Sequence, residues 1–227
     1  MQNEILWFLL LITNFVLISL MYKLFGKIGL FIYIAIITNV QVLVTLELFS
    51  MTVTLGNITY ASTFLITDIL SEYHSEKDAR IAVLIGFCSM IIGTLLMFIV
   101  IYMIPDENGR EIFQNIKDIF SIQPRIILSS VIAYLTSQNV DVMLFNLFKR
   151  KLPDRKFLWI RNNGSTLISQ ILDNVMFNFM AFLGILPLNA ILGIIFSTYV
   201  LKIIVSLLDT PFIYMAKNIK PIKSLKI

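Results

Sequence analysis

Long apolar runs separated by short polar turns make up most of the sequence. A bilayer core of about 30 Å requires about 20 mainly apolar residues in each spanning helix. Runs of this length predict membrane-spanning helices at residues 5–22, 28–46, 51–70, 80–104, 124–148, 163–183 and 188–208. The one sizeable polar connection covers residues 105–123, and its end, residues 111–120, is typical of a short amphipathic surface helix. The pattern predicts an all-α, polytopic integral membrane helix bundle of about seven transmembrane helices, with residues 1–227 forming a single domain.

Lysine and arginine residues concentrate in alternate connections between these spans. Three basic residues fall on one side, namely Arg110, Lys117 and Arg125. The other side holds most of the rest: Lys23, Lys27, Lys77, Arg80, Lys149, Arg150, Lys151, Arg155, Lys156, Arg161, Lys217, Lys220, Lys223 and Lys226. Because basic residues favour the cytoplasmic side, seven spans predict an outer N-terminus and a cytoplasmic C-terminus. Six spans remain an alternative if residues 5–22 lie along the interface.

Composition supports a membrane location and excludes a soluble domain. Hydrophobic residues make up 58% of the 227 residues and charged residues 14%, with a mean hydropathy of +0.86. Soluble domains carry about 45–50% apolar and about 25% charged residues. The net charge of +4 follows from the cytoplasmic basic residues, so it does not predict nucleic-acid binding. The single cysteine, Cys88, excludes an intrachain disulfide and provides no metal site.

Polar residues inside three of the predicted spans repeat at helical spacing. An ionisable group inside a bilayer usually faces the bundle interior, so these stripes are candidate functional residues. The third span carries Asn57, Tyr60, Thr63, Phe64, Thr67 and Asp68. The fifth span carries Ser130, Tyr134, Gln138 and Asp141, and the sixth carries Ser165, Ser169, Gln170 and Asp173. Gly56-Asn57 would open a half-helix, as in the discontinuous helices of transporters.

Structural interpretations of the same residues stay open. Asp68 could be solvated at the inner membrane face, and the fifth-span residues could form hydrogen bonds that join helices, each worth about 0.6 kcal/mol. Asp173, about ten residues into its span, could form a buried ion pair with Lys202 of the last span. No catalytic, nucleotide-binding or metal-binding motif occurs in the sequence, so we expect neither an enzyme nor a cofactor.

The three stripes together favour a site for a flat heterocycle. Aromatic rings stack on such a ligand, while carboxylates and amides recognise its hydrogen-bonding edge. A carboxylate can accept two adjacent N–H groups of a guanine-like edge at once. No cationic side chain lies on the three stripes within the membrane, which disfavours an anionic substrate. The residues alone therefore predict a neutral or weakly cationic solute.

Three runs of residues resemble the signatures of the YhhQ family, also called the vitamin uptake transporter (VUT) family. The first is Gly56-Asn57-Ile58-Thr59-Tyr60 followed by Thr63-Phe64, Thr67-Asp68 and Glu72. The second is Ser130, Ala133-Tyr134, Gln138, Asp141-Val142 and Phe145-Asn146. The third is Ser165-Thr166 and Asp173 followed by Phe177 and Phe179. The similarity runs from about the second span to the last, so residues 5–22 look additional to a six-span family core.

This resemblance implies import of queuosine precursors, which are 7-deazaguanine bases such as 7-cyano-7-deazaguanine and 7-aminomethyl-7-deazaguanine, or of queuine or queuosine itself. We expect alternating access, facilitated or driven by an ion gradient, in a bacterial cell membrane. Asp68, Asp141 and Asp173 would bind the base or exchange protons with it. An alternative is a substrate-binding subunit of a multi-component, ATP-driven importer. The expected partners are the small-molecule substrate and the lipid bilayer, without nucleic acid, and a homo-oligomer stays open.

Overall fold

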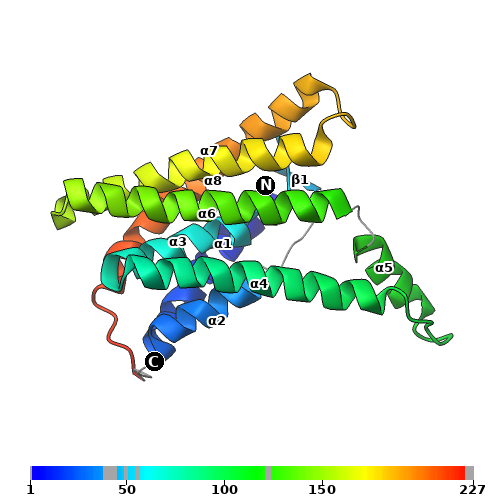
Figure 1. The fold of residues 1–227 in the computed structure, drawn as a ribbon, viewed down its shortest axis with the longest axis horizontal. Helices are drawn as coiled ribbons and strands as arrows, with labels where there is room; N and C mark the ends of the chain where they lie inside the picture. Colours follow the sequence, from blue (N-terminus) through cyan, green and yellow to red (C-terminus); the bar gives the residue numbers. More distant parts are fainter. Residues whose placement is uncertain (1, 38–44, 49–50, 55–56, 121–123, 223–227) are drawn as a thin grey trace.

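The protein is a bundle of long antiparallel helices (Figure 1). The structure, a computed structural model, describes residues 2–37, 45–48, 51–54, 57–120 and 124–222. Its elements are α1 (Gln2–Phe25), α2 (Lys27–Ile37), β1 (Thr45–Leu48), β2 (Met51–Thr54), α3 (Asn57–Tyr73), α4 (Glu76–Val100), α5 (Arg110–Phe120), α6 (Pro124–Lys151), a 3-10 turn η1 (Arg155–Phe157), α7 (Leu158–Phe182) and α8 (Leu188–Ala216). The all-α membrane bundle predicted from the sequence is therefore confirmed.

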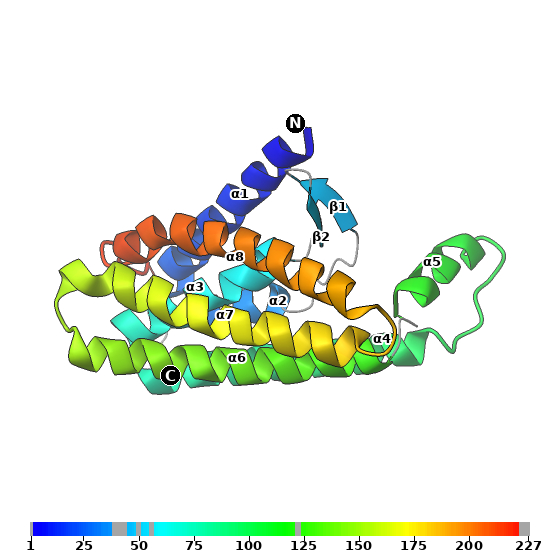
Figure 2. The same ribbon diagram turned by 90° about the horizontal axis from the view of Figure 1, so that it is seen from above.

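Helix α3 lies at the centre of the bundle. It packs against α1, α2, α4, α6, α7 and α8, and every residue from 61 to 70 is buried. Helices α6, α7 and α8 run side by side along one flank, with α2 and α4 on the other (Figures 1 and 2). Because no side of α3 faces lipid over residues 61–70, the polar side chains of this segment must hydrogen-bond within the bundle.

Apolar side chains cover the outside of the bundle. In the described part of the chain, Glu4–Phe25, Glu76–Val100 and Leu188–Ala216 are long and apolar enough to cross a bilayer. On α4, Leu84, Ile92 and Leu95 are each more than half exposed, as lipid-facing residues are. Helices α6 and α7, with 28 and 25 residues, exceed the roughly 20 residues that a span requires. Their lower apolar content reflects the polar stripes that they bury.

Two predicted span boundaries are wrong. Of the helix predicted at 28–46, the described part is α2 up to Ile37, while its last two residues belong to β1. The helix predicted at 51–70 begins only at Asn57. Between them, β1 pairs with β2 as an antiparallel hairpin, with Leu46 opposite Val53 and Glu47 opposite Thr52. Polar and apolar residues alternate along both strands, which is the period of a strand and not of a helix. Average hydropathy does not detect that difference.

The basic turns gather at one end of the bundle, on the left in Figure 1. Lys27 of α2 forms an ion pair with Asp78 of α4 at 3.0 Å, and Arg150 of α6 lies 3.4 Å from Glu76. Beyond α8, the amide of Ile222 donates to the carbonyl oxygen of Lys23. Helix α5, which matches the amphipathic helix predicted at 111–120, lies at the opposite end. The helices thus alternate in direction as the charge pattern predicts.

Candidate functional site

A column of buried polar side chains runs through the centre of the bundle between α3, α6, α7 and α8. It can be divided into levels by position along each helix, since every residue adds about 1.5 Å to a helix. The ion-pair layer consists of Asp173, Lys202, Tyr60 and Ser137. About 10 Å nearer the basic end lies the carboxylate layer, which consists of Asp68, Asp141 and Asp209. The inner-end network of Glu72, Lys149 and Arg161 closes the column.

Asp173 is the centre of the ion-pair layer. Its Oδ2 accepts a hydrogen bond from Lys202 Nζ at 2.7 Å, and its Oδ1 accepts from Ser137 Oγ at 3.1 Å and from the hydroxyl of Tyr60. Both charged side chains are almost fully buried, with 6% of Asp173 and 4% of Lys202 exposed. The Lys202 ammonium also lies 5.2 Å from the centroid of the Tyr60 ring. Three helices thus direct donors at one carboxylate.

Amide and aromatic groups lie beside this layer. Gln138 donates through Nε2 to the hydroxyl of Thr63, and its Oε1 lies 3.4 Å from Thr67 Oγ1. The Tyr60 ring packs edge-on against Phe64 and Tyr134, with centroids 6.1 Å and 6.0 Å apart. The polar groups needed to recognise a heterocycle edge and the rings needed to contact its face therefore occur together.

The carboxylate layer combines three acidic side chains from three helices. Thr166 Oγ1 lies 3.3 Å from Asp68 Oδ2, and Ser169 Oγ donates to Asp141 Oδ1 at 2.9 Å. Asn162 Nδ2 donates to Asp209 Oδ1 at 2.8 Å. All of these partners belong to α7, so that helix supplies neutral donors to carboxylates on α3, α6 and α8.

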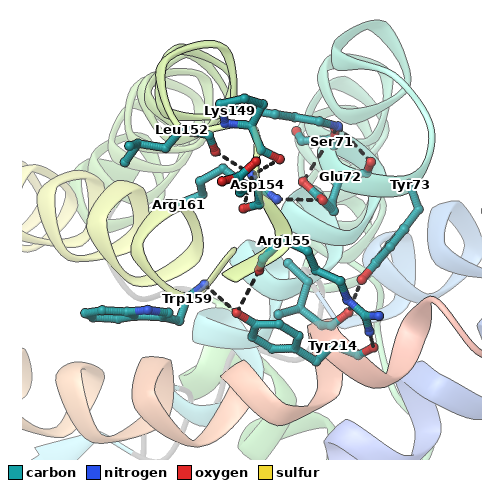
Figure 3. A network of polar contacts seen from close by, with 12 residues as sticks. Ser71, Glu72, Tyr73, Lys149, Leu152, Asp154, Arg155, Trp159, Arg161 and Tyr214 are labelled. Carbon is teal, nitrogen blue, oxygen red and sulfur yellow. Dashed lines mark hydrogen bonds and ion pairs between the residues drawn. The ribbon is translucent and has the colours of Figure 1, made fainter. Parts of the chain in front are cut away.

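The inner-end network joins the C-terminus of α3 to the turn between α6 and α7 (Figure 3). Arg161 is fully buried and donates to the carbonyl oxygens of Leu152 at 2.7 Å and Pro153 at 3.0 Å, and to Glu72 Oε1 at 2.7 Å. Lys149 Nζ donates to the backbone oxygens of Ser71 and Glu72 at 2.5 Å and 2.7 Å. A cation at the last carbonyls of a helix is stabilising because it satisfies acceptors that lack partners inside the helix.

The structure brings most of the residues predicted from the sequence into this column. Buried within it or beside it are Thr63, Phe64, Asp68, Tyr134, Gln138, Asp141, Ser165, Ser169, Gln170 and Asp173, with Tyr60 partly buried. Ser165 Oγ donates to the carbonyl oxygen of Asn162. Both amide atoms of Gln170 are buried without a hydrogen-bond partner. The side chain of Asn57, like Gly56 before it, lies outside the described residues.

A fourth polar stripe, on α8, was missed. Thr198, Lys202, Ser206 and Asp209 follow one another at spacings of four, four and three and are all buried. The same spacing defines the other stripes, but the span predicted at 188–208 ends one residue before Asp209. The three stripes carry no cation, but Lys202 brings one to the site from this fourth helix and pairs with Asp173, the ion pair that the sequence left open. The preference for a neutral solute must therefore rest on the pairing of these charges.

Comparisons with known proteins match the region that contains this column. A family described as "Putative vitamin uptake transporter" matches residues 54–216. A protein of Bacillus subtilis (strain 168) named "Probable queuosine precursor transporter" is 40% identical over 225 residues, which cover 97% of this chain and 97% of that protein. A protein of the same name from Haemophilus influenzae is 26% identical over 134 residues, covering 59% of this chain and 54% of its own length. No solved structure matches the chain.

Proposed function

Since the chain belongs to the vitamin uptake transporter family, we propose that it imports queuosine precursors across the bacterial cell membrane. The substrates are 7-deazaguanine bases, such as 7-cyano-7-deazaguanine or 7-aminomethyl-7-deazaguanine, or queuine or queuosine. The family match supports transport, and the name of the relative that shares 40% identity supports the substrate class. Apolar side chains on the outside of the long helices and a polar column inside are the arrangement that transport of a polar solute requires.

The observation that carries the substrate assignment is the environment of Asp173. Its carboxylate is held by donors from Lys202, Ser137 and Tyr60. A guanine-type edge presents two adjacent N–H groups, so it can replace two of these donors on one carboxylate. Because Lys202 neutralises Asp173, the layer has no surplus charge with which to bind a strongly charged solute.

The groups around Asp173 complete the proposed substrate site. The amide of Gln170 is buried and has no hydrogen-bond partner, so it can bind a heterocycle without first losing a contact. The rings of Tyr60, Phe64 and Tyr134 supply aromatic surface, and Thr63 and Gln138 supply polar groups beside it. We include Asn57, at the start of α3, because of its position on the same helix.

Alternating access requires that one end of the column be closed while the other opens. The inner-end network closes the basic end, since Arg161 and Lys149 fix the end of α3 to α6 and to the α6–α7 turn. We place the cytoplasmic gate there. Opening it requires these contacts to separate, which a substrate can promote only if it binds the open state more tightly.

The basic end faces the cytoplasm in this proposal, with the N-terminus outside. A reporter that is active only in the periplasm or outside the cell should stay inactive when fused after Ala216 and become active when fused before Gln2. The two fusions control for each other. An active C-terminal fusion would contradict the proposed orientation. If both fusions were inactive, both ends would lie in the cytoplasm and the number of spans would be even.

Transport can be tested in bacterial cells that lack both queuosine-precursor synthesis and their own importer. Expression of this chain should restore queuosine in tRNA when a 7-deazaguanine base is supplied in the medium at low concentration. Vector alone should give none. Absence of queuosine, with the chain present in the membrane at normal amounts, would contradict the proposed function.

A further inference from the structure

The carboxylate layer contains more buried negative charge than the structure balances. Asp68, Asp141 and Asp209 are each 1% exposed or less. Among the described residues of the column, Lys202 forms an ion pair with Asp173, and both Arg161 and Lys149 form ion pairs with Glu72. None of these ion pairs includes the three carboxyl groups of the carboxylate layer. An isolated ionised carboxylate is costly in an apolar environment and normally acquires a proton or another cation.

The positions of Asp68 and Asp141 show where such a proton fits. Their hydroxyl donors, Thr166 and Ser169, lie one turn apart on α7, so the two carboxyl groups are neighbours. An ionised carboxylate only accepts hydrogen bonds, so two of them can share one only if one is protonated. One oxygen of each receives a hydroxyl donor from α7, while Asp68 Oδ1 and Asp141 Oδ2 are buried without a partner. A single shared proton would satisfy this pair.

A second observation points to a missing donor in the same layer. Asn162 is fully buried and donates through Nδ2 to Asp209, but its own Oδ1 has no partner. Among the described residues, no group of three acidic, histidine or cysteine side chains is arranged to hold a metal ion. The unsatisfied acceptors in this layer are oxygen atoms, to which a bound proton can be donated in a hydrogen bond.

We propose that Asp68 and Asp141 form a proton-binding pair that couples substrate uptake to the proton gradient. The proposal rests on the transport function proposed above and assigns its driving ion. It also separates these two residues from the substrate site, with which the sequence grouped them. The proton enters from water outside and leaves to water inside, and no covalent bond of the substrate changes.

The position of the pair provides the coupling. Helix α3 carries Tyr60 in the ion-pair layer and Asp68 in the carboxylate layer, and α6 likewise carries Ser137 and Asp141. A shift of α3 against α6 when substrate binds would therefore change the contact between the two carboxyl groups. Among the other described side chains near the pair, α8 contributes the charged group Asp209. Helix α7 contributes neutral groups, namely two hydroxyls and an amide. No basic side chain of α4 forms an ion pair with Asp68 or Asp141.

The test uses the purified chain in liposomes with labelled, uncharged 7-cyano-7-deazaguanine. An acidic exterior, with a gradient of about one pH unit, should raise accumulation about tenfold if one proton accompanies each substrate. Asp141→Asn and Asp68→Asn should lose this response but keep exchange of labelled for unlabelled substrate, because Asn resembles a permanently protonated Asp. Asp141→Glu should retain a response. The matched control is Asp154→Asn at an exposed carboxylate, which should accumulate like the unaltered chain.

Several results would overturn the proposal. One is equal accumulation by the unaltered chain with and without the pH gradient. Another is accumulation driven by a sodium gradient alone. The third is a full response to the pH gradient in either Asn variant. The measurement on the unaltered chain decides the driving ion even if both variants fail to fold. A chain that neither exchanges nor accumulates any 7-deazaguanine would instead contradict the transport function itself.

Discussion

Replacing Asp173 by Asn should lower uptake of a labelled 7-deazaguanine at least about 30-fold. Asp173 is the only carboxylate of the ion-pair layer among the described residues, and it accepts hydrogen bonds from Lys202, Ser137 and Tyr60. Loss of one partner of a buried, charged hydrogen bond costs about 2 kcal/mol or more, which corresponds to about 30-fold in binding. Uptake would be measured in cells at matched amounts of membrane protein, with Asp118→Asn on exposed α5 as the control.

A double variant distinguishes substrate binding from a structural ion pair. Asp173→Asn alone leaves Lys202 buried without its counter-charge, which destabilises the fold. Asp173→Asn combined with Lys202→Met removes both charges, and such neutral replacements are often harmless to stability. We expect the double variant to recover thermal stability in detergent but not uptake. Recovery of uptake together with stability would show that the pair serves only the fold.

Replacing Arg161 by Ala should lower the free energy of unfolding by about 3–5 kcal/mol. The Arg161 guanidinium is fully buried, and its loss leaves Glu72 and the carbonyl oxygens of Leu152 and Pro153 without their donor. The effect would be measured by denaturant or thermal unfolding in detergent micelles. Lys149, the other cation beside Glu72, lies 3.7 Å from Glu72 Oε2 and donates to the backbone oxygens of Ser71 and Glu72, as Figure 3 shows.

The matched control is Arg150→Ala. Arg150 also pairs with a glutamate, Glu76, but at 3.4 Å and with 79% of its side chain exposed. Exposed ion pairs contribute about 0–1 kcal/mol, so this variant should unfold almost like the unaltered chain. Equal losses of stability in the two variants would contradict the role assigned to the inner-end network.

The sequence predicts the polar column well because a bilayer limits where polar residues can lie. Tyr60, Phe64 and Asp68 recur every fourth residue, and a carboxylate within a span must face the interior of the bundle. The suggested pairing of Asp173 with Lys202 is likewise observed. Helical period and the cost of burying charge are local properties, so they can be read from one chain.

What the sequence does not predict depends on tertiary contacts or on boundaries. Arg161 counts as a basic loop residue in the charge pattern, yet α7 begins before it and buries it completely. Asp209 falls one residue beyond the predicted end of the last span, although α8 continues to Ala216. The β1–β2 hairpin occupies a stretch that the length of its apolar runs alone assigns to helices. The separation into an ion-pair layer and a carboxylate layer emerges only when four helices are placed together.

The most direct test of the account is uptake by the purified chain as the sole protein in liposomes. Labelled 7-cyano-7-deazaguanine should enter faster than into protein-free liposomes, saturate with concentration and be blocked by excess unlabelled base. Asp173→Asn, in folded form, should slow this entry at least about 30-fold. Absence of entry with the folded, unaltered chain, or unchanged entry with Asp173→Asn, would contradict transport through the site around Asp173.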